Sequence, residues 1–199
     1  MYDDDGNKIG RPSKAHERSY EILQAAVSVV AREGLEGITF AKVAEASGMQ
    51  RTLVHHYFSS RADLINAFIE HYIGEMGTAI IHRFSGKPLS ERIVMLFTPE
   101  VYRSQDDLIV WLELVAQSAR NPLIKQMLHD LWIQHWLPDF ENQLGQEYPN
   151  ATQDAISSTA YVLACLFEAY WGFSVQGVTD TQKQKQMEQT VLMLLNRLM

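Results

Sequence analysis

A run of polar residues between positions 50 and 57 has the side chains needed to hold a nucleic acid. Arginine, glutamine, threonine, histidine and tyrosine all donate hydrogen bonds to phosphates or base edges. Val54 and Phe58, spaced i and i+4, would turn the other side of the same helix toward a core. The pattern predicts a short helix with one face rich in donors: Gln50, Arg51, Thr52, His55, His56 and Tyr57.

The elements on either side would position this helix. Thr39 can cap a short helix that ends at Gly48, a residue able to adopt the left-handed conformation of a tight turn. Ser60 begins a further helix with a variant of the capping box. Two short helices joined by a tight turn form a helix-turn-helix, whose second helix enters the DNA major groove. Small side chains would let the first helix lie close to its neighbour: Ala41, Ala44 and Ala46.

The same residues carry a family resemblance. The pattern T-x-x-x-V-A-x-x-x-G begins at Thr39, H-Y-F begins at His56, and S-x-x-D-L begins at Ser60. This region resembles the TetR family of one-component transcriptional regulators. The resemblance implies double-stranded DNA with a palindromic operator, a small-molecule effector and a homodimer as partners. A shorter stretch, residues 111–123, resembles the regulatory domain of choline-sensing betaine-operon repressors.

The resemblance also implies how the DNA contacts are divided. Residues on the first turns of the recognition helix would contact base edges, namely Gln50, Arg51, Thr52 and His55. Others would hold phosphates, namely Thr39, His56, Tyr57 and Arg61.

Some positions depart from the family pattern. Gln50 stands where a Ser or Thr usually caps the recognition helix, His55 where a Tyr is usual, and Arg61 where a Lys is usual. Residues 1–13 are expected to form a flexible arm, in which Arg11 resembles a side chain that enters the minor groove. A tail without function is the alternative for that segment.

The charge is unevenly distributed along the chain. Residues 6–62 carry eight basic and five acidic residues, a net charge of +3. Because the whole chain has a net charge of −7, the other residues together carry −10. A basic segment on an acidic body suits a protein that touches DNA at one end. The polar N-terminus is not expected to act as a signal peptide, and no membrane-spanning helix is expected from the apolar runs. The single cysteine, Cys165, fits a cytoplasmic protein and is expected to be buried.

The distribution of glycine, proline and apolar residues predicts an all-α fold of about nine helices. A helix-turn-helix DNA-binding domain of three helices is expected over residues 14–59, and a helical bundle for ligand binding and dimerisation over 60–199. In the second region a long helix from Leu123 to Tyr148 would be kinked near Pro138. The last two helices carry broad apolar stripes, which could be buried within one chain or pair with a second copy.

Large aromatic residues are concentrated in the second region. They would either pack a core or line a mostly apolar pocket with a few polar groups. Aromatic rings beside a carboxylate would suit a cation, whereas rings alone would suit an apolar ligand. The candidate ligand-binding residues are Trp111, Glu113, Gln117, Trp132, Trp136, Glu168 and Trp171.

Other classes of protein have less support in the sequence. No catalytic motif was recognised, so no enzyme activity, cofactor or catalytic residue is expected. Neither His55 and His56 nor His129 and His135 have the i, i+4 spacing of metal ligands on a helix, so no metal site is expected. The competing function is a helical protein-interaction module without specific DNA binding.

Overall fold

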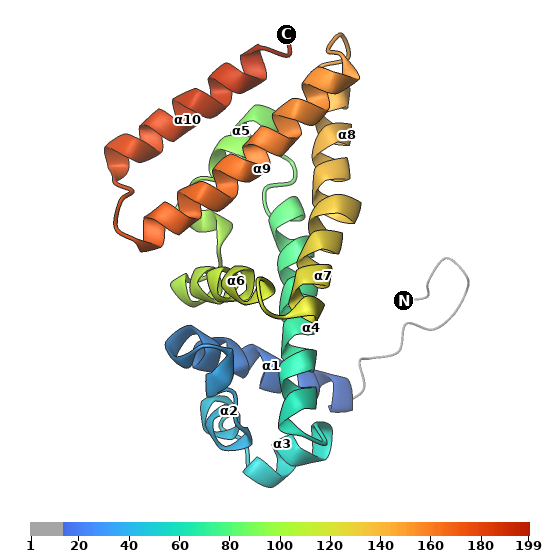
Figure 1. Ribbon diagram of the computed structural model, residues 1–199, viewed down its shortest axis with the longest axis vertical. Coiled ribbons are helices and arrows are strands. Elements are labelled where there is room, and N and C mark those ends of the chain that lie inside the picture. The colour runs from blue at the N-terminus through green and yellow to red at the C-terminus, as the bar shows by residue number, and fades with distance from the viewer. Residues whose placement is uncertain (1–13) are drawn as a thin grey trace, which may run out of the picture. The chain divides into compact units, whose positions relative to one another are not determined.

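The computed structural model describes residues 14–199, and the predicted arm, with Arg11, lies outside the described residues. Over 14–199 the chain forms ten α-helices, α1 to α10, and no strand, so the all-α prediction is confirmed (Figure 1). The chain divides into two compact units, one up to His71 and the other from Tyr72 onward. The boundary lies within α4 rather than at residue 59, and the expected functional division at that residue stays a prediction.

The first unit is built on α1 (Lys14–Glu33), which is followed by the 3-10 turn Leu35–Gly37. Ile22, Ala26 and Val29 form a fully buried stripe along α1, as their helical spacing predicts. The short helices α2 (Phe40–Ser47) and α3 (Arg51–Tyr57) follow, and α2 packs against both α1 and α3. The predicted helix-turn-helix is therefore present.

The turn between α2 and α3 depends on Gly48. This residue has a φ of 67°, in the left-handed region. Residues that have a Cβ adopt this conformation only at a cost in free energy. Its amide donates to the Glu45 carbonyl at 3.2 Å, and the Met49 amide donates to the Ala44 carbonyl at 2.9 Å. These bonds satisfy carbonyls at the end of α2, so the chain can reverse and begin α3 within three residues.

The helix α4 (Arg61–His82) begins after Ser60, whose hydroxyl accepts from the Asp63 amide at 3.1 Å. The second unit continues with α5 (Leu89–Met95), the 3-10 turn Pro99–Val101, α6 (Gln105–Ser118) and α7 (Pro122–Asp130). It ends with α8 (Leu137–Glu147), α9 (Gln153–Val175) and α10 (Thr181–Asn196). Within this unit α6 packs on α7, α8 on α9, and α10 on α5 (Figure 1).

A π-helical turn, Leu131–Trp136, connects α7 to α8 and accounts for the predicted disturbance near Pro138. Proline has no amide hydrogen to donate to the preceding turn. Just before it, the Leu137 amide bonds to the Trp132 carbonyl five residues earlier, which widens the helix. The turn changes the helical register, and Trp136 within it is 1% exposed.

One expectation for the last helices needs revision, and one open alternative is decided for part of their surface. The prediction that Cys165 is buried is wrong, because this residue is exposed. At 100° per residue it lies about 200° from Leu163 and from Phe167, both of which face the core. The apolar stripes containing Ile156 and Val191 are buried within the chain, and other apolar residues of α9 and α10 are exposed.

Candidate nucleic-acid interface and ligand pocket

The helix α3 has one buried side and one polar side. Val54 is fully buried and Phe58 is 7% exposed, so both anchor the helix in the first unit. The side chains of Arg51, Thr52 and His56 are exposed on the rest of its surface. Tyr57 is half-buried, and its ring meets the His56 ring edge to face at 5.4 Å. The arrangement gives a rigid helix whose exposed donors all come from one short segment.

Gln50 and His55 have particular environments. Gln50 precedes α3 with an extended backbone and makes no side-chain capping bond, so its amide is not committed to closing the helix. The ring of His55 stacks on the ring of Phe40 at the start of α2, with centroids 3.6 Å apart and an angle of 18° between planes. This stacking fixes the orientation of the imidazole, which remains exposed at its edge.

Thr39 performs the predicted capping role. Its hydroxyl accepts from the Lys42 amide at 3.3 Å, closing the first turn of α2. A hydroxyl that accepts one bond can still donate another, so this geometry is compatible with a phosphate contact. Arg61 lies at the first position of α4, but its guanidinium binds backbone carbonyls of the 3-10 turn region at 2.7 and 2.8 Å.

The second unit brings several of the candidate aromatic residues together. Trp111 of α6 stacks parallel to Trp136 with centroids 6.3 Å apart, and Trp132 meets Trp136 edge to face at 4.6 Å. Phe167 of α9 also meets Trp136, at 5.8 Å. Trp171 joins this group through Tyr102, and its indole N–H donates to the Leu96 carbonyl at 3.0 Å. Most of these rings therefore pack the core of the second unit.

Glu168 lies beside the same rings. Its carboxyl accepts from the Trp111 indole N–H at 3.1 Å. Burial raises the pKa of Glu168 to about 7, and the bond from Trp111 lowers it by less. The carboxyl therefore changes charge near neutral pH within an aromatic environment.

Glu113 and Gln117 are not brought together with Trp111. At 100° per residue, Glu113 lies about 200° around α6 from Trp111, and Gln117 lies about 240° from it. The two residues are half-buried, and the Gln117 amide donates to the Glu113 carboxyl at 3.1 Å. They occupy a different side of α6.

Trp136, which stacks on Trp111, also lines a pocket. Of the sequence candidates only Trp136 lines it; the further lining residues are Ile80, Phe84, Leu89, Arg92, Ile93, Leu96, Asp139, Phe140 and Gln143. The buried carbonyl oxygen of the Gln143 side chain has no hydrogen-bond partner, and its amide donates to Asp139. No sequence signal other than aromatic content could have identified this site, because a pocket forms where packing is incomplete.

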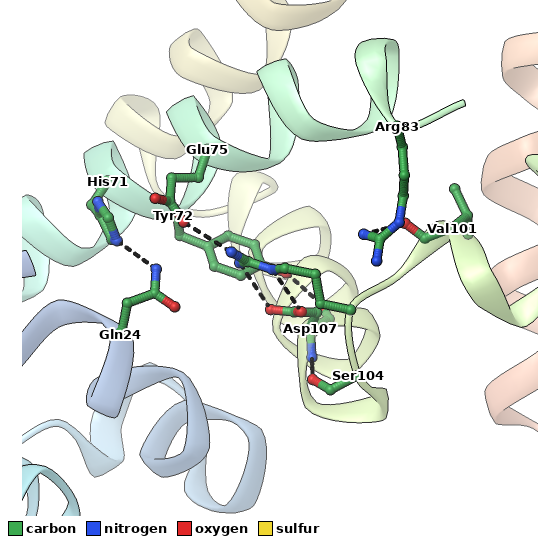
Figure 2. Close-up of polar contacts among 9 residues, drawn as sticks. Gln24, His71, Tyr72, Glu75, Arg83, Val101, Ser104 and Asp107 are labelled. Atoms are coloured by element: carbon green, nitrogen blue, oxygen red, sulfur yellow. Dashed lines mark hydrogen bonds and ion pairs between the residues drawn. The ribbon is translucent and has the colours of Figure 1, made fainter. Parts of the chain in front are cut away.

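A polar network in the second unit connects α4 to the start of α6 (Figure 2). Asp107 is 3% exposed, and its carboxylate accepts from the Arg103 guanidinium at 3.1 and 3.3 Å. Arg103 also donates to Glu75 at 3.0 Å, and the Tyr72 hydroxyl donates to the Asp107 carbonyl. In the first unit, Figure 2 also shows Gln24 of α1 bonded to His71 of α4 at 2.9 Å. Removing Arg103 would leave the buried Asp107 carboxylate without its charged partner, which is costly.

Two further observations concern residues 14–199 alone. No group of three or more His, Cys, Asp or Glu side chains in this part of the chain is arranged to hold a metal ion. None of its helices combines the length and the apolar character that crossing a lipid bilayer requires.

Replacing Glu168 with Gln should change how stability depends on pH. A carboxyl whose pKa rises from 4.5 to about 7 on folding binds more protons in the folded state, so the free energy of unfolding falls as pH rises between these values. The loss should reach about 3 kcal/mol in the natural chain and be absent in E168Q. Urea denaturation of both proteins at pH 5 and pH 8 measures this, and parallel pH dependences would contradict the assigned environment.

Comparison with known proteins places the helix-turn-helix in a family. Residues 22–68 match the family model of bacterial regulatory proteins, tetR family. The HTH-type transcriptional regulator BetI of Burkholderia lata is 26% identical over 117 residues, which cover 56% of this chain and 60% of BetI.

Solved structures share the fold over most of the chain. Salmonella enterica GusR has a TM-score of 0.71 at 19% identity, covering 96% of this chain and 100% of GusR. A transcriptional regulator from Saccharomonospora viridis in complex with choline has a TM-score of 0.65 at 20% identity, covering 90% of this chain and 96% of that one. Residues 22–68, which include α2 and α3, therefore match the tetR family of bacterial regulatory proteins, and the chain shares the fold of these solved structures.

Proposed function

We propose that this protein is a ligand-responsive transcriptional regulator, a homodimeric repressor released from a palindromic operator by a small molecule. The observation that carries the proposal is the α2–turn–α3 unit, in which Val54 and Phe58 are buried and the donors of α3 are exposed. A helical interaction module would have no need for this concentration of exposed donors at the start of a short helix. The protein would act on DNA in the cytoplasm.

The DNA contacts follow from the geometry of α3. Gln50, Arg51 and Thr52 stand at its N-terminal end, which in a helix-turn-helix contacts base edges, and Arg51 can pair bidentately with guanine. His55 would reach a base edge or phosphate with the exposed edge of its stacked ring. Thr39, His56 and Tyr57 would hold phosphates and set the register. Arg11 remains the proposed minor-groove residue.

Replacing Arg51 with Ala should weaken specific DNA binding without affecting the fold. Loss of one bidentate base contact costs about 1–3 kcal/mol, or roughly five- to a hundredfold in affinity. Because Arg51 is exposed, thermal unfolding by circular dichroism should be unchanged. Fluorescence anisotropy with duplex DNA from upstream of the protein's own gene, and with a scrambled duplex, provides the measurement.

The matched control is Arg120→Ala, which removes the same charge from an exposed position in the second unit. It should bind the upstream duplex like the natural chain. Unchanged affinity in both variants would show that α3 is not the recognition helix. Equal weak binding of the natural chain to both duplexes would favour a structural role for the helix-turn-helix.

A homodimer is supported by the apolar residues left exposed on the last two helices. Tyr161 and Phe173 of α9 are 63% and 54% exposed, and Met193 of α10 is 60% exposed. Exposed apolar residues that form a contiguous patch are typical of interaction surfaces, and α9 and α10 pack against each other. Two recognition helices about one DNA turn apart would read both halves of a palindrome, which strengthens binding.

Replacing Tyr161 with Glu should shift the protein toward monomer, because a charge would be buried without a partner at the interface. We expect the dimer dissociation constant to rise by about a hundredfold. Ile133→Glu is the control, since Ile133 is 52% exposed but belongs to the π-helical turn rather than to α9 or α10. Sedimentation equilibrium of both variants decides, and a dimeric Y161E protein would place the interface elsewhere.

The proposed effector site is the pocket beside Trp136. Its walls are mostly apolar. The Asp139 carboxylate and the unpartnered Gln143 carbonyl are hydrogen-bond acceptors, and Arg92 adds a positive charge. These groups favour a small molecule with an apolar or methylated body and at least one donor. Choline is a suitable probe because a Saccharomonospora viridis regulator of the same fold was solved with it. The effector would act only through different affinities for the DNA-bound and free conformations, with α4 as the connecting helix.

Choline should bind and reduce operator affinity, and glycine betaine should do neither. Betaine keeps the trimethylammonium group but replaces the hydroxyl donor with a carboxylate, which cannot donate to the Gln143 carbonyl oxygen. Gln143→Leu should weaken choline binding by about tenfold, since the hydroxyl loses its acceptor. Isothermal titration calorimetry measures both ligands, and equal binding of betaine would contradict the donor requirement. Absence of choline binding would exclude this effector and leave the DNA-binding proposal intact.

A further inference from the structure

Arg61 makes three hydrogen bonds to the segment that precedes α2. Its Nε donates to the Ile38 carbonyl at 2.7 Å, and its Nη2 donates to the Glu36 carbonyl at 2.8 Å. The same Nη2 donates to the Glu36 carboxylate at 3.0 Å. One residue at the first turn of α4 thus holds a segment more than twenty residues earlier in the chain.

These bonds are well suited to a guanidinium. The planar group presents its N–H donors in a fixed fork, and hydrogen bonds from a charged donor are stronger than those between neutral groups. A lysine ammonium has a single donor centre and cannot reach two carbonyls with the same geometry. The Ile38 side chain is fully buried, so this segment is held by the core on one side and by Arg61 on the other.

The charge of Arg61 is also paired. Glu36 places a carboxylate at 3.0 Å from Nη2, and that carboxylate is on an exposed side chain. A DNA phosphate approaching the guanidinium would meet this negative charge as well. The resemblance to the TetR family suggested a phosphate-binding role for Arg61, but the ion pair weakens the attraction on which such a role depends.

We infer that Arg61 is a positioning residue for DNA recognition rather than a phosphate ligand. It holds the 3-10 turn Leu35–Gly37, and with it the Thr39 cap and α2, against the start of α4. Since α2 packs on α3, the contact fixes the orientation in which α3 presents its donors. This inference rests on the proposed function, because it concerns the same DNA-binding surface.

The test compares Arg61→Ala and Arg61→Lys by anisotropy with the upstream duplex across a salt series. A positioning role predicts that both variants lose about tenfold in affinity while the slope of log K against log salt stays unchanged. A phosphate contact predicts that Arg61→Ala lowers the slope by about one and that Arg61→Lys restores both slope and affinity. The second result would overturn the inference.

Glu36→Ala separates the two roles further. It removes the counter-charge but leaves both carbonyl acceptors in place, so a positioning role predicts nearly unchanged affinity and slope. If Arg61 contacted a phosphate, removing this carboxylate would increase both. Increased affinity together with a steeper slope would therefore also contradict the inference.

Hydrogen exchange without DNA provides an independent measurement. Both Arg61 variants should increase exchange of the Gly37 and Ile38 amides by about tenfold, and Glu36→Ala should not. Unchanged exchange in Arg61→Lys, which keeps the charge and is expected to fold, would overturn the inference. If the natural chain bound no specific DNA, the proposed function would fail, and the exchange rates would still decide whether Arg61 holds this segment.

Discussion

The burial of Val54 and Phe58 is the contact on which the helix-turn-helix depends. The helices α2 and α3 have eight and seven residues, far below the length at which an isolated helix is stable in water. They persist because α3 is anchored by these side chains and α2 packs on α1. The same anchoring determines which residues of α3 remain exposed, so the stability of α3 and its set of exposed donors depend on a single packing arrangement.

Much of this arrangement could be predicted from the sequence because its determinants are local. Thr39 and Gly48 act through bonds to residues three to five positions away, and helical spacing identifies the buried side of α1. The bonds of Arg61 could not be predicted, since they join residues 23 and 25 positions apart. Cys165 was misjudged because an apolar run on a helix does not reveal which of its members face outward.

The second unit was less predictable for a different reason. The aromatic residues indicated either a core or a pocket, and the structure uses Trp136 for both, with Trp111 on one part of its surface and the pocket on another. The π-helical turn before Pro138 sets the register of this side chain. A one-residue change in register depends on how α7 and α8 pack, which no local pattern in the sequence encodes.

The distribution of the indoles has a consequence for how the two units can be observed separately. All four tryptophans belong to the second unit, and the first unit has none. Intrinsic emission excited at the red edge of indole absorption therefore monitors the second unit alone. Loss of helix that precedes any spectral change in the emission would reveal that the first unit melts first and independently.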